Sequence, residues 1–156
     1  MNHDQFQLLG HLADRLQRLT ETSLQMRLGI GYSQYKILTA LQSATNLQQR
    51  QIAEQLGQTE ASVSRQIKAM VRHGLLNAAV NPLNRRERRI SLTPLGAELL
   101  TRSLQVIEKE QSDALGALPL DDARSLGRHL TVIHERLCTP SAAGACNYFT
   151  VLDGKR

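Results

Sequence analysis

Arginine is concentrated in one short segment of the chain, NRRERR at residues 84–89, which holds four arginines and one glutamate in six positions. A guanidinium group donates hydrogen bonds in a planar fork that matches the acceptors of phosphates and base edges. The same six residues also fit a solvated surface turn or a loose basic tag. The neighbouring elements must decide among these three interpretations.

The excess positive charge of the chain, +5 at neutral pH, lies within a single central stretch. Residues 1–60 carry five Lys/Arg and five Asp/Glu, and residues 93–156 carry seven against eight. Residues 61–92 carry seven cations against Glu87 alone, which is a net charge of +6. Clustering of this kind is typical of a binding site for a polyanion.

A second group of cations lies on the helix predicted for TEASVSRQIKAMVRHG, which Thr59 is suited to cap and Gly74 to end. One side of this helix is apolar, with Val63, Ile67, Met70 and Val71. The other side carries Ala61, Ser62, Ser64, Arg65, Lys68 and Arg72. Short residues let a helix approach base edges in the DNA major groove, and the cations supply donors. An ordinary amphipathic surface helix has the same division, so this helix alone decides nothing.

The adjoining segments predict a helix-turn-helix followed by a β-hairpin. A short helix is expected over 49–56, and Gly57 suits the left-handed residue after its end. After Gly74, LLNAAV has strand character, NPLNRR contains turn formers and ERRISLT alternates between apolar and polar residues. The arginines therefore lie at and just beyond a hairpin tip, where arginine can enter the narrow minor groove.

Long amphipathic helices are predicted on both sides of this central region. Leucines recur at three- and four-residue steps over 5–27, and further helices are expected over 33–44, 94–115 and 121–137. Thr93-Pro94 supplies a capping residue and a proline at the first helical position. By themselves the leucine stripes indicate either a helical core or an interface.

The remaining residues point to no other chemistry. No apolar run approaches 18 residues and no signal or transit peptide is recognised, so we expect a cytoplasmic protein without membrane contact. Cys138 and Cys146 have no zinc-binding spacing and are interpreted as free thiols, with a redox-responsive pair as the alternative. The sequence has no triad, carboxylate-pair or phosphate-loop signature, and its histidines do not cluster. We therefore predict no enzyme, metal or cofactor.

The order of elements and two sequence runs resemble the MarR family of transcriptional regulators. These runs are LQQRQIAEQLGQTEASVSRQIKAMVRHGLL and NPLNRRERRISLTPLG, within a resemblance that covers about residues 6–137. The resemblance implies a mainly α fold with a small β-hairpin wing. Its parts are a winged helix-turn-helix at 31–93, a helical dimerisation domain at 1–30 and 94–138, and a tail at 139–156. It also implies a ligand-responsive repressor that binds double-stranded DNA at a pseudo-palindromic operator as a homodimer.

Roles for individual residues follow from the same resemblance. Gln49 and Arg50 are expected to approach phosphates, Arg86 to enter the minor groove, and Arg85 and Arg88 to contact the DNA backbone. The implied recognition surface consists of Thr59, Ala61, Ser62, Ser64, Arg65 and Lys68.

Two features of the wing and its surroundings depart from the family pattern. Asn81 and Asn84 stand where aspartates are usual, and a neutral side chain braces a wing arginine more weakly than a carboxylate. Gln48 replaces the usual threonine cap before the helix-turn-helix.

The effector is the least determined part of the resemblance. Family members often bind small aromatic or phenolic anions, and others sense oxidants through a cysteine near the N-terminus, whereas this chain has none before Cys138. His11 and Arg15, one helical turn apart, are candidates to meet an anion, and an exposed or interface-paired couple is the alternative. A winged-helix module that binds RNA or protein is the alternative function.

Overall fold

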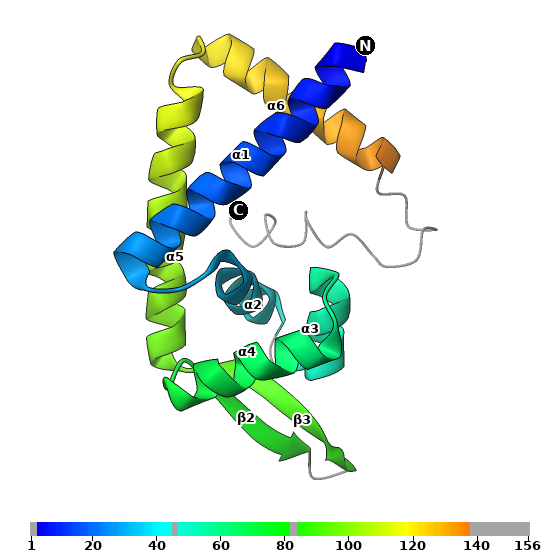
Figure 1. Ribbon diagram of the computed structural model, residues 1–156, viewed down its shortest axis with the longest axis vertical. Coiled ribbons are helices and arrows are strands. Elements are labelled where there is room, and N and C mark those ends of the chain that lie inside the picture. Colours follow the sequence, from blue (N-terminus) through cyan, green and yellow to red (C-terminus); the bar gives the residue numbers. More distant parts are fainter. Residues whose placement is uncertain (1–2, 45–46, 82–83, 138–156) are drawn as a thin grey trace.

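The described chain folds into six helices and a small antiparallel sheet, as Figure 1 shows. The computed structural model describes residues 3–44, 47–81 and 84–137, except for the side chains of residues 3, 81, 84–87 and 115. The helices are α1 (His3–Leu28), α2 (Tyr32–Ser43), α3 (Gln49–Leu56), α4 (Glu60–Arg72), α5 (Pro94–Leu115) and α6 (Leu120–Leu137). The strands are β1 (Leu47–Gln48), β2 (Leu76–Asn81) and β3 (Asn84–Leu92). The predicted fold class, mainly α with a β-hairpin wing, is confirmed.

The helix boundaries follow from local chemistry that the sequence displays. Thr59 Oγ1 accepts a hydrogen bond from the Ser62 N–H at 3.2 Å and so caps α4. Thr93 Oγ1 accepts from the Gly96 N–H at 3.0 Å and so caps α5. Gly57, after α3, has the left-handed φ of 61° that the predicted turn requires. At the start of α3, the side chain of Gln51 accepts a hydrogen bond from the Gln48 N–H at 2.8 Å.

The sheet has the strand order β1-β3-β2. Strands β2 and β3 form the predicted hairpin, in a register that pairs Leu76 with Leu92 and becomes irregular after Val80. The sequence does not predict β1, which pairs antiparallel with β3 through Leu47 opposite Ile90. A strand of two residues is too short to display alternation, so its pairing became evident only in three dimensions.

The buried core lies between α2, α3, α4 and the sheet, and α1 and α5 each contribute to it. The largest fully buried side chains are Leu24, Ile37, Leu38, Ile52, Met70, Leu76, Ile90, Leu100, Val63 and Ser103. Gly96 packs the start of α5 closely against the turn between α4 and β2, because a Cβ at this position would lie 2.1 Å from the Leu75 carbonyl oxygen. Nearby, Thr93 donates a hydrogen bond of 2.6 Å to the Gly74 carbonyl oxygen. The hairpin is therefore anchored tightly to the base of α5.

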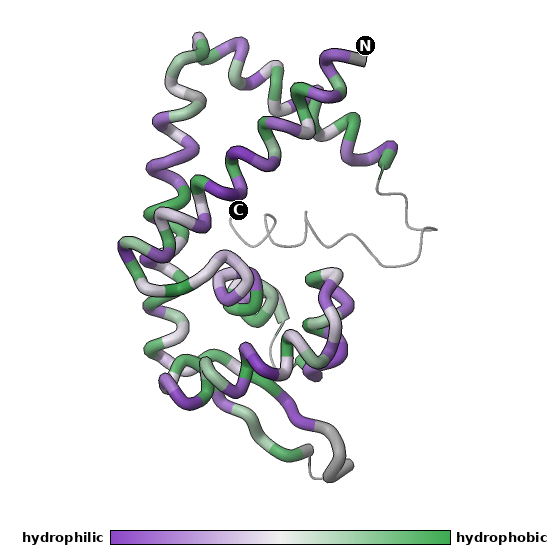
Figure 2. The backbone as a smooth tube through the Cα atoms, viewed as in Figure 1, coloured by the Kyte–Doolittle hydropathy of each residue, from purple (hydrophilic) through white to green (hydrophobic). Residues whose placement is uncertain are grey.

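The terminal helices differ from this core, because many of their large apolar residues remain exposed. We call these residues the leucine stripe: Phe6, Leu9, Leu12, Leu16 and Leu19 on α1, and Leu126, Leu130 and Leu137 on α6. Helix α6 has no buried residue, and Figure 2 shows hydrophobic residues recurring among hydrophilic ones along both helices. Among the described helices, none is long and apolar enough to cross a membrane.

Candidate nucleic-acid interface

Helix α4 divides into a buried face and an exposed cationic face. Val63, Ile67 and Met70 are buried against the core. The residues left exposed on the helix include Ala61, Arg65, Lys68 and Arg72, while Ser62 and Ser64 are half-buried. The predicted recognition surface is therefore a helix face supported from behind by the core, with its small residues near the N-terminus and its cations further along.

The start of α4 is held by its own capping residue and by a hydrogen bond from α3. Thr59 is exposed, but its hydroxyl oxygen is engaged as the cap of α4. Gln49, at the start of α3, donates from Nε2 to the Glu60 carbonyl oxygen at 3.5 Å and is half-buried. Gln49 therefore ties α3 to α4, which is a positioning contact that the sequence did not predict.

A chain of side-chain hydrogen bonds connects α2 to α4. Gln58 donates from Nε2 to Ser33 Oγ at 2.8 Å, and its Oε1 accepts from Gln66 Nε2 at 3.2 Å. Gln66 Nε2 also lies 3.5 Å from Ser62 Oγ. We call Ser33, Gln58, Gln66 and Ser62 the polar chain. It fixes the turn between α3 and α4, and therefore the angle at which the recognition surface is presented.

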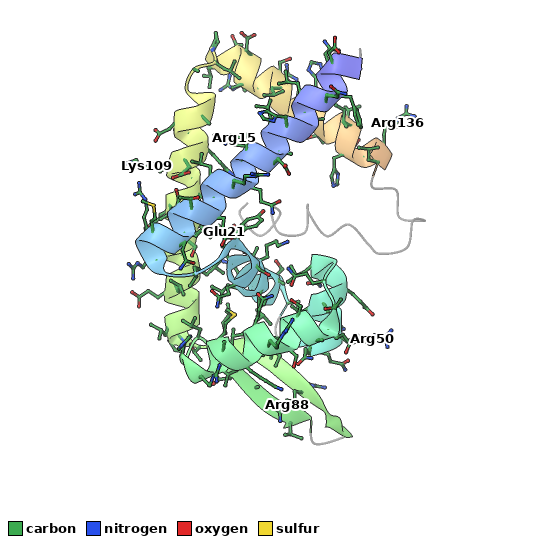
Figure 3. All side chains as sticks on the ribbon, viewed as in Figure 1. Arg15, Glu21, Arg50, Arg88, Lys109 and Arg136 are labelled. Atoms are coloured by element: carbon green, nitrogen blue, oxygen red, sulfur yellow. The ribbon has the colours of Figure 1, made fainter. Side chains whose placement is uncertain are left out.

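The cations of α4 meet one wing arginine in a surface groove of about 560 Å³. We call it the cationic groove, and it is lined by Gln49, Arg65, Ile67, Lys68, Val71, Arg72, Ala78, Arg88 and Ile90. Arg88 lies on β3 below α4, as labelled in Figure 3. Within the described part of the chain, the lining contains four cations and no carboxylate. The groove therefore brings together the α4 cations and Arg88, which the sequence predicted on separate elements.

Arg50 is placed differently from the groove cations. Its Nε donates a hydrogen bond of 2.8 Å to Glu54 Oε1, one turn further along α3, as part of an ion pair. The hydrogen bond and charge of Glu54, followed by the charge of Glu60, raise the pKa of Arg50 above its ordinary value. Arg50 is exposed and is labelled beside α3 in Figure 3. Its charge is partly compensated within the chain, which weakens the case for a strong phosphate contact.

The remaining predicted site residues either lie away from the cationic groove or belong to parts of the chain that the structure does not describe. The backbones of Arg85 and Arg86 belong to β3, but their side chains lie outside the described residues. His11 and Arg15 are exposed on α1 and do not line the cationic groove. Cys138 and Cys146, the basis of the redox alternative, also lie outside the described residues. Within the described ranges, no three His, Cys, Asp or Glu residues are grouped as metal ligands.

Two parts of this site were missed at the level of sequence. Arg72 lies on the predicted cationic face but is not among the predicted DNA-binding residues. Its position, one turn after Lys68 and two turns after Arg65, was enough to include it. Gln58 and Gln66 gave no such signal, because glutamine is as common on solvated helix faces as in buried networks.

Comparison with known proteins agrees with this architecture. Residues 28–87 match the sequence profile of the MarR family. No curated protein sequence matches the chain.

Several solved structures share the fold. Wild-type MarR from E. coli in its apo form superimposes with a TM-score of 0.77 at 19% sequence identity, over 85% of this chain and 96% of that one. PcaV from Streptomyces coelicolor, in complex with its natural ligand, gives 0.64 at 24% identity, over 81% and 91%. A point mutant of S. aureus MepR, bound to an oligodeoxyribonucleotide, gives 0.60 at 21% identity, over 85% and 97%.

Proposed function

We propose that this chain, a winged-helix protein of the MarR family, is a sequence-specific DNA-binding repressor. It acts as a homodimer on a pseudo-palindromic operator in the cytoplasm. In this proposal residues 31–93 form the DNA-binding region, and residues 1–30 and 94–138 form the dimerisation region.

The observation that supports DNA binding most directly is the convergence of cations from two elements on one face. Arg65, Lys68 and Arg72 from α4 and Arg88 from β3 line one groove without a carboxylate among the described lining residues. Crowded cations repel one another, and a polyanion relieves that repulsion while releasing its own counterions. A point mutant of MepR, which shares the fold, has been solved bound to an oligodeoxyribonucleotide.

In this proposal some residues contact base edges and others contact the DNA backbone. Ala61, Ser62 and Ser64 admit α4 deeply into the major groove, and Arg65 reads a base edge there, because arginine pairs with guanine through two hydrogen bonds. Arg86 enters the adjacent minor groove, and Arg85 holds the backbone beside it.

Dimerisation is supported by the leucine stripe. The stripe leaves large apolar side chains of α1 and α6 exposed in a single chain, and burial against a second copy removes them from water. Two recognition helices held about 34 Å apart then enter successive major grooves of one operator. The dimer is thus required for half-site spacing as well as for stability.

Ligand response is proposed as a shift between dimer states of different spacing. An effector that binds more tightly to a dimer with the wrong spacing lowers DNA affinity in proportion to its preference. PcaV, of the same fold, has been solved with its natural ligand. We propose a small aromatic anion as the effector class.

The experiment that tests the function is selection of duplex fragments from random DNA with the purified full-length protein. We expect a two-fold symmetric consensus, bound with a steep loss of affinity as salt increases. Binding of duplex with no sequence preference would contradict the proposal and favour an RNA- or protein-binding module.

On the selected operator, Arg86→Ala is expected to lower affinity roughly 10–100-fold while the dimer stays folded. Arg65→Ala is expected to lower affinity and also the ratio of operator to random-DNA binding. Wild-type affinity in the first variant would remove the minor-groove role, and an unchanged ratio in the second would reduce Arg65 to a phosphate contact.

A further inference from the structure

We infer that one sugar–phosphate strand of the DNA binds in the cationic groove, and that Arg72 contacts a phosphate of this strand. This inference rests on the proposed function. It adds a phosphate-binding subsite and a residue that was not assigned to DNA binding above.

The first argument comes from the topology of duplex DNA. Neighbouring major and minor grooves are separated by a sugar–phosphate strand. A protein that places a helix in the one and a hairpin in the other must therefore straddle that strand. The cationic groove lies between these two elements, since α4 supplies one wall and β2 and β3 supply the other.

The second argument comes from the spacing of the cations. Lys68 and Arg72 lie one helical turn apart on α4, and Arg65 continues the same row toward the residues that meet base edges. Arg88 faces them from β3, on the same side of the strand as Ile90. A row of cations with a further cation opposite suits an extended line of charge, whereas a compact anion requires convergent donors at one point.

The third argument is that the described acidic side chains do not neutralise the groove cations. Of the ion pairs formed among described residues, none includes a groove cation, whereas Arg50 on α3 is paired with Glu54. Beneath the cations, Ile67 and Ile90 are almost fully buried and exclude water from the floor. A charge on such a low-dielectric floor interacts more strongly with an external phosphate than one surrounded by water.

Arg72 is the residue that distinguishes this inference from simple helix recognition. It belongs to the last turn of α4, far from the N-terminal residues that meet base edges. Its contribution is therefore expected to be independent of base sequence. Lys68 and Arg88 share this role in the groove.

The test compares Arg72→Gln with wild type on the selected operator and on random duplex over a range of salt concentrations. Arg102→Gln is the matched control, because Arg102 is exposed on α5 and does not line the groove. Because each protomer of the dimer loses one phosphate contact, we expect Arg72→Gln to lower the slope of log affinity against log salt by about 1.8. It should weaken operator and random DNA by the same factor and leave the operator preference intact. Arg72→Lys should retain the slope, as should the control.

A second measurement locates the contact. Ethylation of one phosphate in each half-site should weaken wild-type binding but not that of Arg72→Gln, which has already lost the partner of that phosphate. An unchanged salt slope in Arg72→Gln, or an identical ethylation pattern in both proteins, would overturn the inference while leaving the proposed function standing. If wild type selects no duplex at all, both fail together.

A small organic anion is the other occupant that the groove chemistry admits. Calorimetric titration of DNA-free protein with benzoate distinguishes it. Benzoate binding that Arg72→Gln abolishes, in a variant with an unchanged salt slope on DNA, would assign the groove to small anions and overturn the inference. If benzoate does not bind and Arg72→Gln lowers the salt slope, the result supports a DNA sugar–phosphate strand as the occupant of the groove.

Discussion

The winged-helix region and the terminal helices differ in how far they bury their apolar residues within a single chain. In the winged-helix region, Ile37, Ile52, Met70 and Ile90 are each no more than 1% exposed in a single chain. On the terminal helices, Leu12 remains 48% exposed and Leu130 41%, and α6 buries no residue.

The two regions therefore complete their folding by different means. The core of the winged-helix region is closed by residues of its own chain. None of the 18 residues of α6 is fully buried, and a helix of that length has only marginal stability in water without an apolar partner. We therefore expect substitutions to act through chain stability in the first region and through association in the second.

The strongest disruption should come from placing charge in the leucine stripe. The double variant Leu12→Glu, Leu130→Glu should raise the dimer dissociation constant by roughly 1,000-fold or more, because burying unpaired carboxylates costs several kcal/mol. Light scattering measures the mass, and operator binding should be lost with the dimer.

The matched control for the stripe is Val132→Glu, which also adds a charge to α6. Val132 is 57% exposed and is displaced from the stripe around the helix. It should stay dimeric. A double stripe variant that remains a dimer at low concentration would contradict the assignment of α1 and α6 to the interface.

An intermediate effect is expected at the base of the wing. Gly96→Ala places a Cβ at 2.1 Å from the Leu75 carbonyl oxygen, so the start of α5 must move away from the turn between α4 and β2. We expect a loss of about 3 kcal/mol in the free energy of unfolding, measured by denaturant titration. Gly10→Ala is the control, because an added Cβ there meets nothing within 4 Å and raises helix propensity. Equal stability of the two variants would show that α5 can shift without cost.

A more modest change is expected in the polar chain. Gln58→Leu removes the hydrogen bonds to Ser33 and Gln66, and should lower stability by about 1–2 kcal/mol. Operator affinity should fall by about 3- to 10-fold, because the angle of α4 is less well fixed. The exposed Gln42→Leu on α2 is the control. Full operator affinity in Gln58→Leu would limit the polar chain to a structural role.

Much of the fold could be predicted because its signals are local. Thr59 and Thr93 indicate helix starts, Gly57 indicates a left-handed turn, and each occupies the predicted position. Element order then followed from the hydrophobic period, which changes from helical to alternating after Gly74.

The parts that could not be predicted depend on contacts between distant residues. The pairing of Leu47 with Ile90 and the hydrogen bond of Gln58 to Ser33 join segments that local patterns treat separately. The Arg50–Glu54 pair was visible as a spacing of four residues. Its meaning required the three-dimensional arrangement: Arg50 is compensated, whereas no described residue forms an ion pair with a groove cation.

Helix α5 connects the wing to α6, so its length determines how far the wing moves when the helix tilts. It begins at the anchored base of the wing and ends where the chain turns into α6, as Figure 1 shows. Its 22 residues make a rod of roughly 33 Å. Because Gly96 and Thr93 fix the lower end tightly, a tilt of about 10° at the upper end swings the wing by roughly 6 Å, the product of that length and the sine of the tilt. A displacement of that size is close to two base-pair steps of DNA, so in the proposed dimer a small rotation at the interface would put the two half-sites out of register.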